Sequence, residues 1–334
     1  MTLASIAAAW EAIAGIAVET PVIGSEILAE RAGADVLLKL ESLQVTGSFK
    51  VRGAARRMLA LSDEERARGV VACSSGNHGR AVAYVAELLG IAATICVPEW
   101  VDPVKLQAIR LHGAEIVLQG KSYDDAEEAS LQVQRERGLA YIHPFDDPLV
   151  IEGQGTIGLE LLEQVRSLDT VVVPLSGGGL ISGIARTVKS YDPGIRVVGV
   201  SAVNARVMYE SLRAGRPIAF PEPPTIANAL SGGIGLDNRY TFRLVRDLVD
   251  EHVLVGEDEI REAVAFAAGE HKVIAEGGGA VGIAALLARR FESAGKRIAV
   301  VVSGGNVGSD ALVEVINSVG APWQEDQGRT TDKG

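Results

Sequence analysis

Short apolar runs alternate with longer amphipathic segments from about residue 70 onward. This alternation is typical of a parallel β-sheet covered by helices. The predicted strands are Val70–Cys73, Ala93–Val97, Glu115–Leu118, Thr170–Pro174, Arg196–Val200 and Arg297–Val302. The predicted helices, with apolar residues three or four positions apart, include Gly79–Leu89, Val104–His112, Ser122–Arg137, Gly153–Arg166 and Glu257–Ala268. The pattern therefore predicts an α/β fold built from strand–helix–strand units.

Three of the predicted strands run directly into turns rich in glycine and serine. These turns cover residues 74–79, 176–180 and 303–306. Ligands of open α/β sheets bind at the carboxyl ends of the strands. We therefore expect the three turns to contribute to one shared site.

Composition narrows the class of protein. With 334 residues the chain favours one large or two interlocked domains. The net charge of −11 and the scattered basic residues argue against nucleic acid as a partner. Cys73 and Cys96 are too few for a disulfide framework and lack zinc-ligand spacing, which indicates a reducing compartment and no metal site of that kind. Without a signal peptide or a run of roughly 20 apolar residues, a cytoplasmic protein with no membrane contact is expected.

The stretch from Thr46 to Ala54 carries the first candidate for chemistry. Ser48 can cap a helix, and Lys50 would then lie at the positive N-terminal end, where its ammonium form is disfavoured. A lysine with a lowered pKa is the nucleophile that a carbonyl cofactor requires. Taken alone, this stretch fits an ordinary surface lysine better, and only its context favours a catalytic one.

The glycine-rich turns supply that context. Residues 176–180 offer consecutive backbone N–H groups and a helix dipole to a phosphate, without dinucleotide or Walker spacing, although a simple packing turn fits about as well. Residues 74–79 offer small polar groups suited to a carboxylate and a phenolate-like oxygen. Ser303 is either a helix cap or the hydroxyl partner of a ring nitrogen, and His78 by itself fits a structural histidine.

Together with residues 38–50, these segments resemble the fold-type-II pyridoxal-phosphate (PLP) enzymes of the threonine dehydratase and serine racemase family, from Thr20 to about Ser309. The resemblance implies PLP as the cofactor, a small amino acid as the substrate, and a homodimer. It also implies two open α/β lobes, with a small mobile lobe of residues 52–145 inserted in a large PLP-binding lobe of residues 1–51 and 146–334.

The resemblance also implies roles for single residues. Lys50 binds PLP covalently and is catalytic, Phe49 packs against the ring, and Asn77 binds the phenolic oxygen. The residues that hold the phosphate are Ser176, Gly177, Gly178, Gly179 and Leu180, and Ser303 faces the pyridine nitrogen. A neutral hydroxyl there makes the ring a weaker electron sink, which favours rapid β-elimination.

The substrate carboxylate is assigned to the turn that follows Cys73. Its candidate ligands are Ser74, Ser75, Asn77 and His78. Ser75 occupies the position that faces the catalytic lysine across the cofactor in racemases, so it is a second catalytic candidate. The predicted reaction is β-elimination from a β-hydroxy amino acid to a 2-keto acid and ammonia. The alternatives are an amino-acid racemase, a β-replacement enzyme of the cysteine synthase kind, and a silent ligand-binding scaffold.

Several positions depart from the family pattern. Ser201 and Val207 stand where serine racemase-like members carry an acidic pair for a divalent cation, so no metal site is expected. Ala229 replaces a glycine, and Ser176 replaces the first glycine of the phosphate turn. Residues 232–240 resemble the hydroxyectoine-utilisation dehydratases and threo-3-hydroxyaspartate ammonia-lyases. A second substrate carboxylate would need a cation, for which Arg80 and Arg239 are the candidates.

Overall fold

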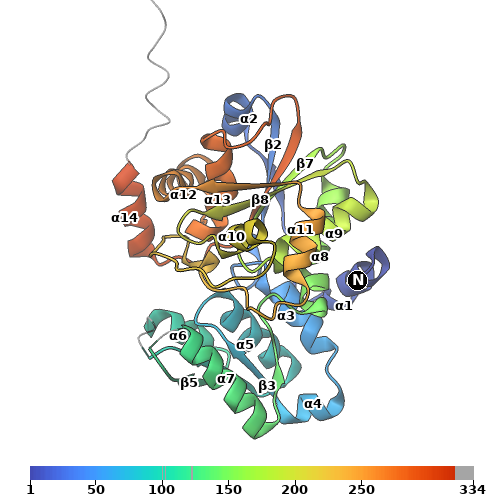
Figure 1. The fold of residues 1–334 in the computed structure, drawn as a ribbon, viewed down its shortest axis with the longest axis vertical. Helices are drawn as coiled ribbons and strands as arrows, with labels where there is room; N and C mark the ends of the chain where they lie inside the picture. Colours follow the sequence, from blue (N-terminus) through green and yellow to red (C-terminus); the bar gives the residue numbers. More distant parts are fainter. Residues whose placement is uncertain (100, 102, 122, 320–334) are drawn as a thin grey trace, which may run out of the picture.

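Two separate β-sheets organise the protein (Figure 1). The computed structural model describes residues 1–99, 101, 103–121 and 123–319. The larger sheet contains, in spatial order, β1 (Val22–Gly24), β2 (Asp35–Leu40), β10 (Arg297–Val302), β7 (Thr170–Pro174), β8 (Arg196–Ala202) and β9 (Glu251–Val255). The smaller contains β5 (Glu115–Leu118), β4 (Ala93–Val97), β3 (Val70–Cys73) and β6 (Ala140–Tyr141). Within these ladders all neighbouring pairs are parallel except β1 with β2.

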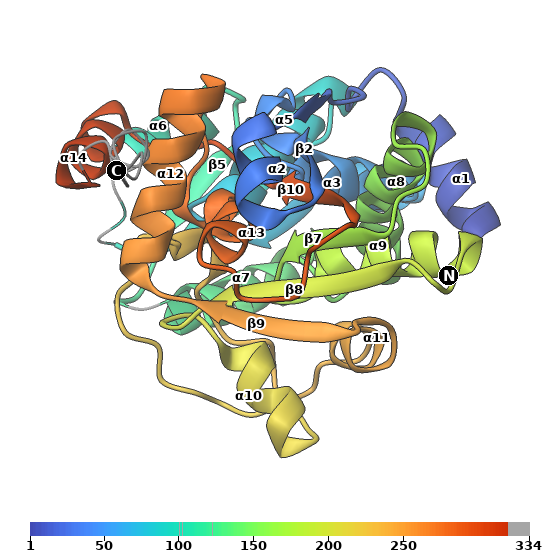
Figure 2. The same cartoon turned by 90° about the horizontal axis from the view of Figure 1, so that it is seen from above.

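Helices cover both faces of the larger sheet (Figure 2). One face carries α2 (Glu26–Ala32), α12 (Glu257–His271) and α13 (Gly277–Leu287), with α14 (Ser309–Val319) against α12. The other carries α8 (Pro148–Gln164), α9 (Gly179–Tyr191), α10 (Val207–Ala214) and α11 (Thr241–Leu248). Val172 packs into the first core and its neighbour Val171 into the second. Because successive side chains of a strand point to opposite faces, burial on both sides produces the continuous apolar runs of the sequence.

The smaller sheet lies in the lower half of Figure 1 with its own core. Its helices are α4 (Asp63–Arg68), α5 (Asn77–Leu89), α6 (Pro103–Arg110) and α7 (Tyr123–Arg137). Helix α3 (Lys50–Leu59) packs against α5 on one side and against α8 of the larger sheet on the other, and α1 (Leu3–Ile13) contacts both α3 and α8. Two short 3-10 helices, η1 (Glu41–Leu43) and η2 (Asn228–Leu230), complete the elements. Helix α3 therefore joins the two halves.

The predicted strands have the expected bounds, except that β8 continues to Ala202. The predicted helices also form, with ends that coincide or shift by up to five residues, and the expected start at Ser122 lies outside the described residues. The sequence interpretation did not identify β1, β2, β6 or β9. These are very short or interrupted by charged residues, so their pattern is weak.

The expected helix cap at Ser48 is wrong. Helix α3 begins at Lys50 with Phe49 as the preceding residue, and no side chain caps it. Ser48 instead forms an antiparallel bridge with Gly304, just beyond β10. This pairing holds the chain before Lys50 against the end of the larger sheet, so tertiary contacts replace the local cap. None of the helices in the described part of the chain is long and apolar enough to cross a membrane.

Candidate active site

Lys50 is the first residue of α3, and its amine lies deep within the protein although the residue retains partial access to solvent. The Nζ donates to the carbonyl oxygen of Pro144 at 2.8 Å and lies 5.2 Å from the ring centroid of Phe49. Burial lowers the pKa of Lys50 to about 8, and the nearby Glu276 opposes this effect. Compared with an exposed lysine, much more of this amine is neutral and nucleophilic near neutral pH.

The glycine turn after β7 reaches the same place through Phe145, which follows Pro144. A Cβ on Gly177 would lie 2.5 Å from the Phe145 ring, so only glycine permits this approach. Gly178 has a φ of 87° and precedes the first helical residue, Gly179. The N–H groups of the first turn of α9 have no acceptor within the helix, and the dipole there is positive. Ser176 is anchored by the donation of its Oγ to the Leu230 carbonyl oxygen at 2.7 Å.

The turn after β3 supplies polar groups from the other half of the protein. Ser74 accepts the Gly76 N–H on its Oγ at 3.2 Å, and Ser75 next to it is partly buried. The Nε2 of His78 donates to the carbonyl oxygen of Ile142 at 2.8 Å. Burial, followed by the charge of Lys50, lowers the pKa of His78 to about 3. His78 is therefore neutral at physiological pH, with one ring nitrogen committed to the backbone.

Asn77 opens α5 and binds two residues from the far end of the chain. Its Nδ2 donates to Oε1 of Glu276 at 2.6 Å, and its Oδ1 accepts from Nδ2 of Asn306 at 2.7 Å. Sequence reasoning missed Glu276, which directly precedes the first glycine of α13. An acidic residue before the Gly277–Gly279 run is a signal that could have identified it. Arg80 donates its Nη1 to Oδ1 of Asn306 at 2.7 Å.

The residues that follow β10 pack against the segment that precedes Lys50. The carbonyl oxygen of Ser303 accepts the Phe49 N–H at 3.1 Å, and Ser303 is buried. Gly305 donates its N–H to the carbonyl oxygen of Gly47 at 2.9 Å. A Cβ on Gly47 would lie 2.3 Å from Oδ1 of Asn306. The glycine before Lys50 therefore allows the asparagine to pack beneath the lysine segment.

A second set of charges lies two residues beyond Lys50. Arg52 is buried and donates to both carboxylate oxygens of Glu41, at 2.8 Å each, and to both of Glu160, at 2.5 and 2.9 Å. Lys39 also donates to Glu160 at 2.5 Å. Burial opposes the charged form of Arg52, but Glu41 and Glu160 outweigh it and raise its pKa. These paired charges fix the start of α3 to η1 and α8.

Three further residues named in the sequence analysis, Ser201, Val207 and Arg239, form contacts with residues other than Lys50. Ser201 donates its Oγ to the carbonyl oxygen of Leu175 at 2.7 Å, and Val207 packs in the apolar core. These two positions therefore offer no carboxylate to a metal ion. Arg239 has an exposed position, and its backbone N–H donates to Asp146 at 2.7 Å. This contact places the chain at Arg239 next to the 144–146 segment, which also faces Lys50.

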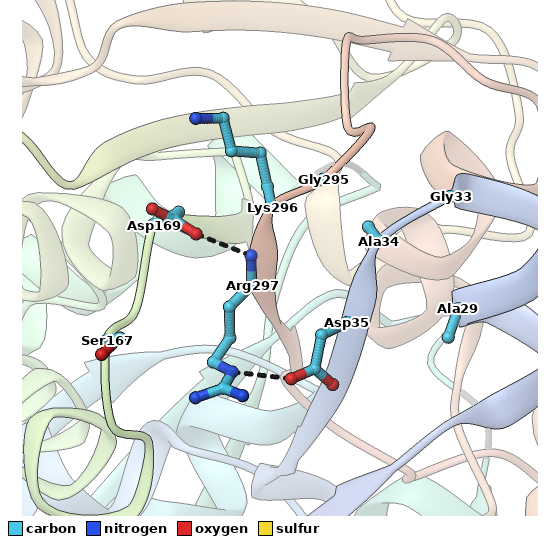
Figure 3. Close-up of a pocket in the computed structure, with 9 residues that line it drawn as sticks. All are labelled: Ala29, Gly33, Ala34, Asp35, Ser167, Asp169, Gly295, Lys296 and Arg297. Carbon is cyan, nitrogen blue, oxygen red and sulfur yellow. Dashed lines mark hydrogen bonds and ion pairs between the residues drawn. The ribbon is translucent and has the colours of Figure 1, made fainter.

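A hollow elsewhere on the larger sheet has no comparable chemistry (Figure 3). It lies at the amino ends of β2 and β10, opposite the ends where ligands of such sheets bind. Arg297 donates its Nε to Asp35 at 2.6 Å and its N–H to Asp169 at 2.8 Å. Figure 3 shows the Lys296 amine directed away from both contacts. Asp35, Asp169 and Arg297 are thus bound to one another, and we assign no reaction to this hollow.

The residues around Lys50 fit PLP. Lys50 provides a buried amine of lowered pKa, the start of α9 provides N–H groups for a phosphate, and Asn77 provides an amide. All three come from different elements and meet around residues 144–145 and the end of β10. PLP, when bound there, would be held by groups that sequence reasoning had already named, and Glu276 would hold the Asn77 amide.

Comparison with known proteins agrees with this geometry. The model of the family "Pyridoxal-phosphate dependent enzyme" matches residues 13–304. A protein from Thermotoga maritima named L-threonine ammonia-lyase is 43% identical over 95% of this chain and 78% of its own length. A putative threonine dehydratase from Sinorhizobium fredii is 44% identical over 98% of both chains. The solved structure of maize serine racemase superposes with a TM-score of 0.89 at 38% identity, covering 95% of this chain and 97% of that one. The chain with its buried Lys50 therefore belongs to the family of pyridoxal-phosphate-dependent enzymes.

Proposed function

We propose that this enzyme eliminates water and then ammonia from a β-hydroxy amino acid of the threonine or serine class, releasing a 2-keto acid. The observation that carries this proposal is the Lys50 amine, buried beside Phe49 with a pKa lowered to about 8. The similarity of the whole chain to the proteins named L-threonine ammonia-lyase and putative threonine dehydratase supports the choice of reaction. PLP supplies the electron-accepting group that makes the Cα–H bond of an attached amino acid acidic.

Lys50 has two tasks in this reaction. Its neutral amine would hold PLP, and once free of the cofactor it would take the proton from the substrate Cα. The lowered pKa serves both steps, because the amine is unprotonated in a large fraction of molecules near pH 8. Pro144, whose carbonyl oxygen accepts from Nζ, holds the amine in place before the cofactor is attached.

The turn after β3 is proposed to bind the substrate carboxylate. Ser74, Ser75 and the N-terminus of α5 offer hydroxyl and N–H donors in a compact group. His78 contributes through packing, since its Nε2 is committed to Ile142 and its ring is neutral. If Ser75 also delivers a proton to the opposite face of Cα, racemisation would accompany elimination.

A substrate with a second carboxylate is the second candidate. Residues 232–240, which include Arg239, favour it, because the Asp146 contacts place this segment next to the residues facing Lys50. An arginine there can bind a carboxylate through two parallel hydrogen bonds. The substrate would then be a 3-hydroxyaspartate or a related product of hydroxyectoine breakdown.

Three further features remain predictions. Residues 52–145 are expected to move as a small lobe that closes over the substrate and excludes water. The enzyme is expected to be a homodimer and to act in the cytoplasm. Light scattering on the purified protein checks the dimer, and small-angle scattering with and without a substrate analogue checks the closure.

The deciding experiment measures ammonia and keto-acid release by the PLP-loaded enzyme. The substrates are L-threonine, L- and D-serine, and the threo and erythro 3-hydroxyaspartates, with chiral analysis of the remaining amino acid. Preference for threonine or serine supports the main proposal, and preference for a hydroxyaspartate supports the second candidate. Formation of a new thioether amino acid when a thiol is added, without release of ammonia or keto acid, would instead indicate β-replacement and refute elimination.

A further inference from the structure

Four polar side chains form one continuous chain of hydrogen bonds behind Lys50. Nη1 of Arg80 donates to Oδ1 of Asn306 at 2.7 Å, and Nδ2 of Asn306 donates to Oδ1 of Asn77 at 2.7 Å. Nδ2 of Asn77 then donates to Oε1 of Glu276 at 2.6 Å. The chain connects the first turn of α5, the loop after β10 and the start of α13. No single stretch of sequence contains all of its members.

Chemistry at the ends of this chain fixes its direction. An arginine can only donate and a carboxylate can only accept, so the two amides between Arg80 and Glu276 must be oriented alike. Nδ2 of Asn306 also donates to the carbonyl oxygen of Thr46 at 2.9 Å, which independently identifies its nitrogen. Both N–H groups of Asn306 are then used. Asn77 uses one of its two N–H groups on Glu276 and keeps the other.

We propose that Arg80 and Asn306 are positioning residues, which orient the Asn77 amide so that its remaining N–H donates to the phenolic oxygen of PLP. Arg80 acts through Asn306 and makes no contact with the substrate. Without this chain, the Asn77 amide could turn over and present its oxygen to another oxygen. The inference rests on the PLP site alone, so it holds for any amino-acid substrate.

Packing around the chain supports this role. A Cβ on Gly47 would approach Oδ1 of Asn306 to 2.3 Å, and a Cβ on Gly304 would approach Oε1 of Glu276 to 2.4 Å. Backbone therefore encloses both the acceptor of Arg80 and the acceptor of Asn77. Among the described residues Arg80 has no carboxylate within ion-pair distance, and its Nε is buried without a hydrogen-bond partner. Its charge is thus directed at Asn306, which strengthens that hydrogen bond.

The experiment uses the enzyme with PLP and without substrate. In R80M, the PLP dissociation constant should rise by about 10-fold, because one charge-assisted hydrogen bond that orients Asn77 is lost. The visible absorbance of the bound cofactor should change at the same time, because its phenolic oxygen loses an oriented donor. R80K keeps a donor for Asn306 and should restore much of both. R243M is the matched control, since Arg243 is exposed on α11 and should leave both unchanged.

A second variant tests the direction of the chain. N306D can still accept from Arg80 but cannot donate to Asn77, so it should weaken PLP binding and alter the spectrum at least as much as R80M. Chemical denaturation measures whether each variant stays folded. Unchanged PLP affinity and spectrum in R80M, with KM raised only for dicarboxylic substrates, would make Arg80 a substrate contact and overturn the proposal. A loss of affinity that R80K fails to restore, with a matching loss of unfolding free energy, would also overturn it.

Discussion

Lys50 and Arg52 lie two residues apart at the start of α3, yet their pKa values are shifted in opposite directions. Arg52 donates to two buried carboxylates, Glu41 and Glu160, which raise its pKa although burial opposes the charge. Lys50 donates to a backbone carbonyl oxygen, and burial lowers its pKa to about 8. A fully paired cation stabilises position, whereas an incompletely paired amine is available for chemistry.

The closeness of Arg52 to Lys50 also matters for the position of the Lys50 amine. Arg52 fixes the first turn of α3 to η1 and α8, and the same turn places the Lys50 amine. A nucleophile must be held within a fraction of an ångström of its reaction geometry. The paired charges therefore provide rigidity to the neighbouring residue, whose own charge is left largely uncompensated.

Replacing the nucleophile is expected to have the largest effect. K50A should lower turnover by roughly 10²–10⁴-fold or more, because the proton-transfer group is lost. It should also abolish covalent attachment of PLP, which mass spectrometry after borohydride reduction measures on the peptide containing residue 50. Turnover close to that of the wild type would refute the role of Lys50.

Removing the paired cation should affect stability instead. R52M leaves Glu41 and Glu160 buried without their shared partner, and the free energy of unfolding should fall by roughly 3–5 kcal/mol. R57M is a control on the same helix, because Arg57 forms a partly exposed ion pair with Asp147 at 3.3 Å. Its effect should stay below about 1 kcal/mol. Equal losses in the two variants, measured by denaturant titration, would contradict the comparison.

Without cofactor, removing the Lys50 charge should stabilise the protein. The pKa of Lys50 is lower in the folded protein than in the unfolded chain, so below pH 8 the wild type bears the full cost of burying the ammonium group. K50M should therefore be more stable by about 1–3 kcal/mol at pH 7. This difference should shrink as the pH rises from about 8 toward the unfolded pKa near 10.5. A constant difference across this range would be inconsistent with a lowered pKa.

Near neutral pH the smallest effect concerns His78, which lies near Lys50. Burial and Lys50 lower the pKa of His78 to about 3, so below its usual pKa of 6.5 the unfolded chain binds a proton that the folded protein rejects. This group should reduce the free energy of unfolding by about 1.4 kcal/mol per pH unit as the pH falls from 6.5 toward 3. H78Q retains a donor for Ile142 and should show a shallower decline. Identical slopes for the two proteins would refute the neutral histidine.

Local sequence was enough for the five helices named in the sequence analysis and for the core strands. The apolar runs of β7 and β10 could be recognised without tertiary knowledge, because both strands are buried on both faces and are therefore almost continuously apolar. The three glycine- and serine-rich turns were also recognisable locally, since their residue types suit phosphate and carboxylate binding, whereas Lys50 became a candidate only in combination with them. Strand β9, with Glu251 and His252 at its start, was not identified because its pattern is mixed.

Contacts between residues far apart in the sequence decided the parts of the site that local patterns did not predict. Glu276 and Asn77 are separated by 199 residues, and nothing local to either predicts that their side chains bind. The capping role expected of Ser48 failed because the bridge to Gly304 supplies the contact instead. The sequence named Arg80 as a candidate for binding a second substrate carboxylate, and it gave no sign that Nη1 of Arg80 donates to Oδ1 of Asn306.

The sequence by itself determined the α/β class and the turns at the strand ends, because both depend on residue type and local periodicity. Lys50 became a candidate only through its combination with those turns. Only the tertiary structure decided which of the buried charges are paired. Lys39, Lys50 and Arg52 are all basic residues of neighbouring segments. Burial lowers the pKa values of Lys39 and Lys50, whereas Glu41 and Glu160 outweigh burial at Arg52 and raise its pKa. Those carboxylates reach Arg52 from η1 and α8, and distances between such elements are set by packing rather than by the order of residues in the chain.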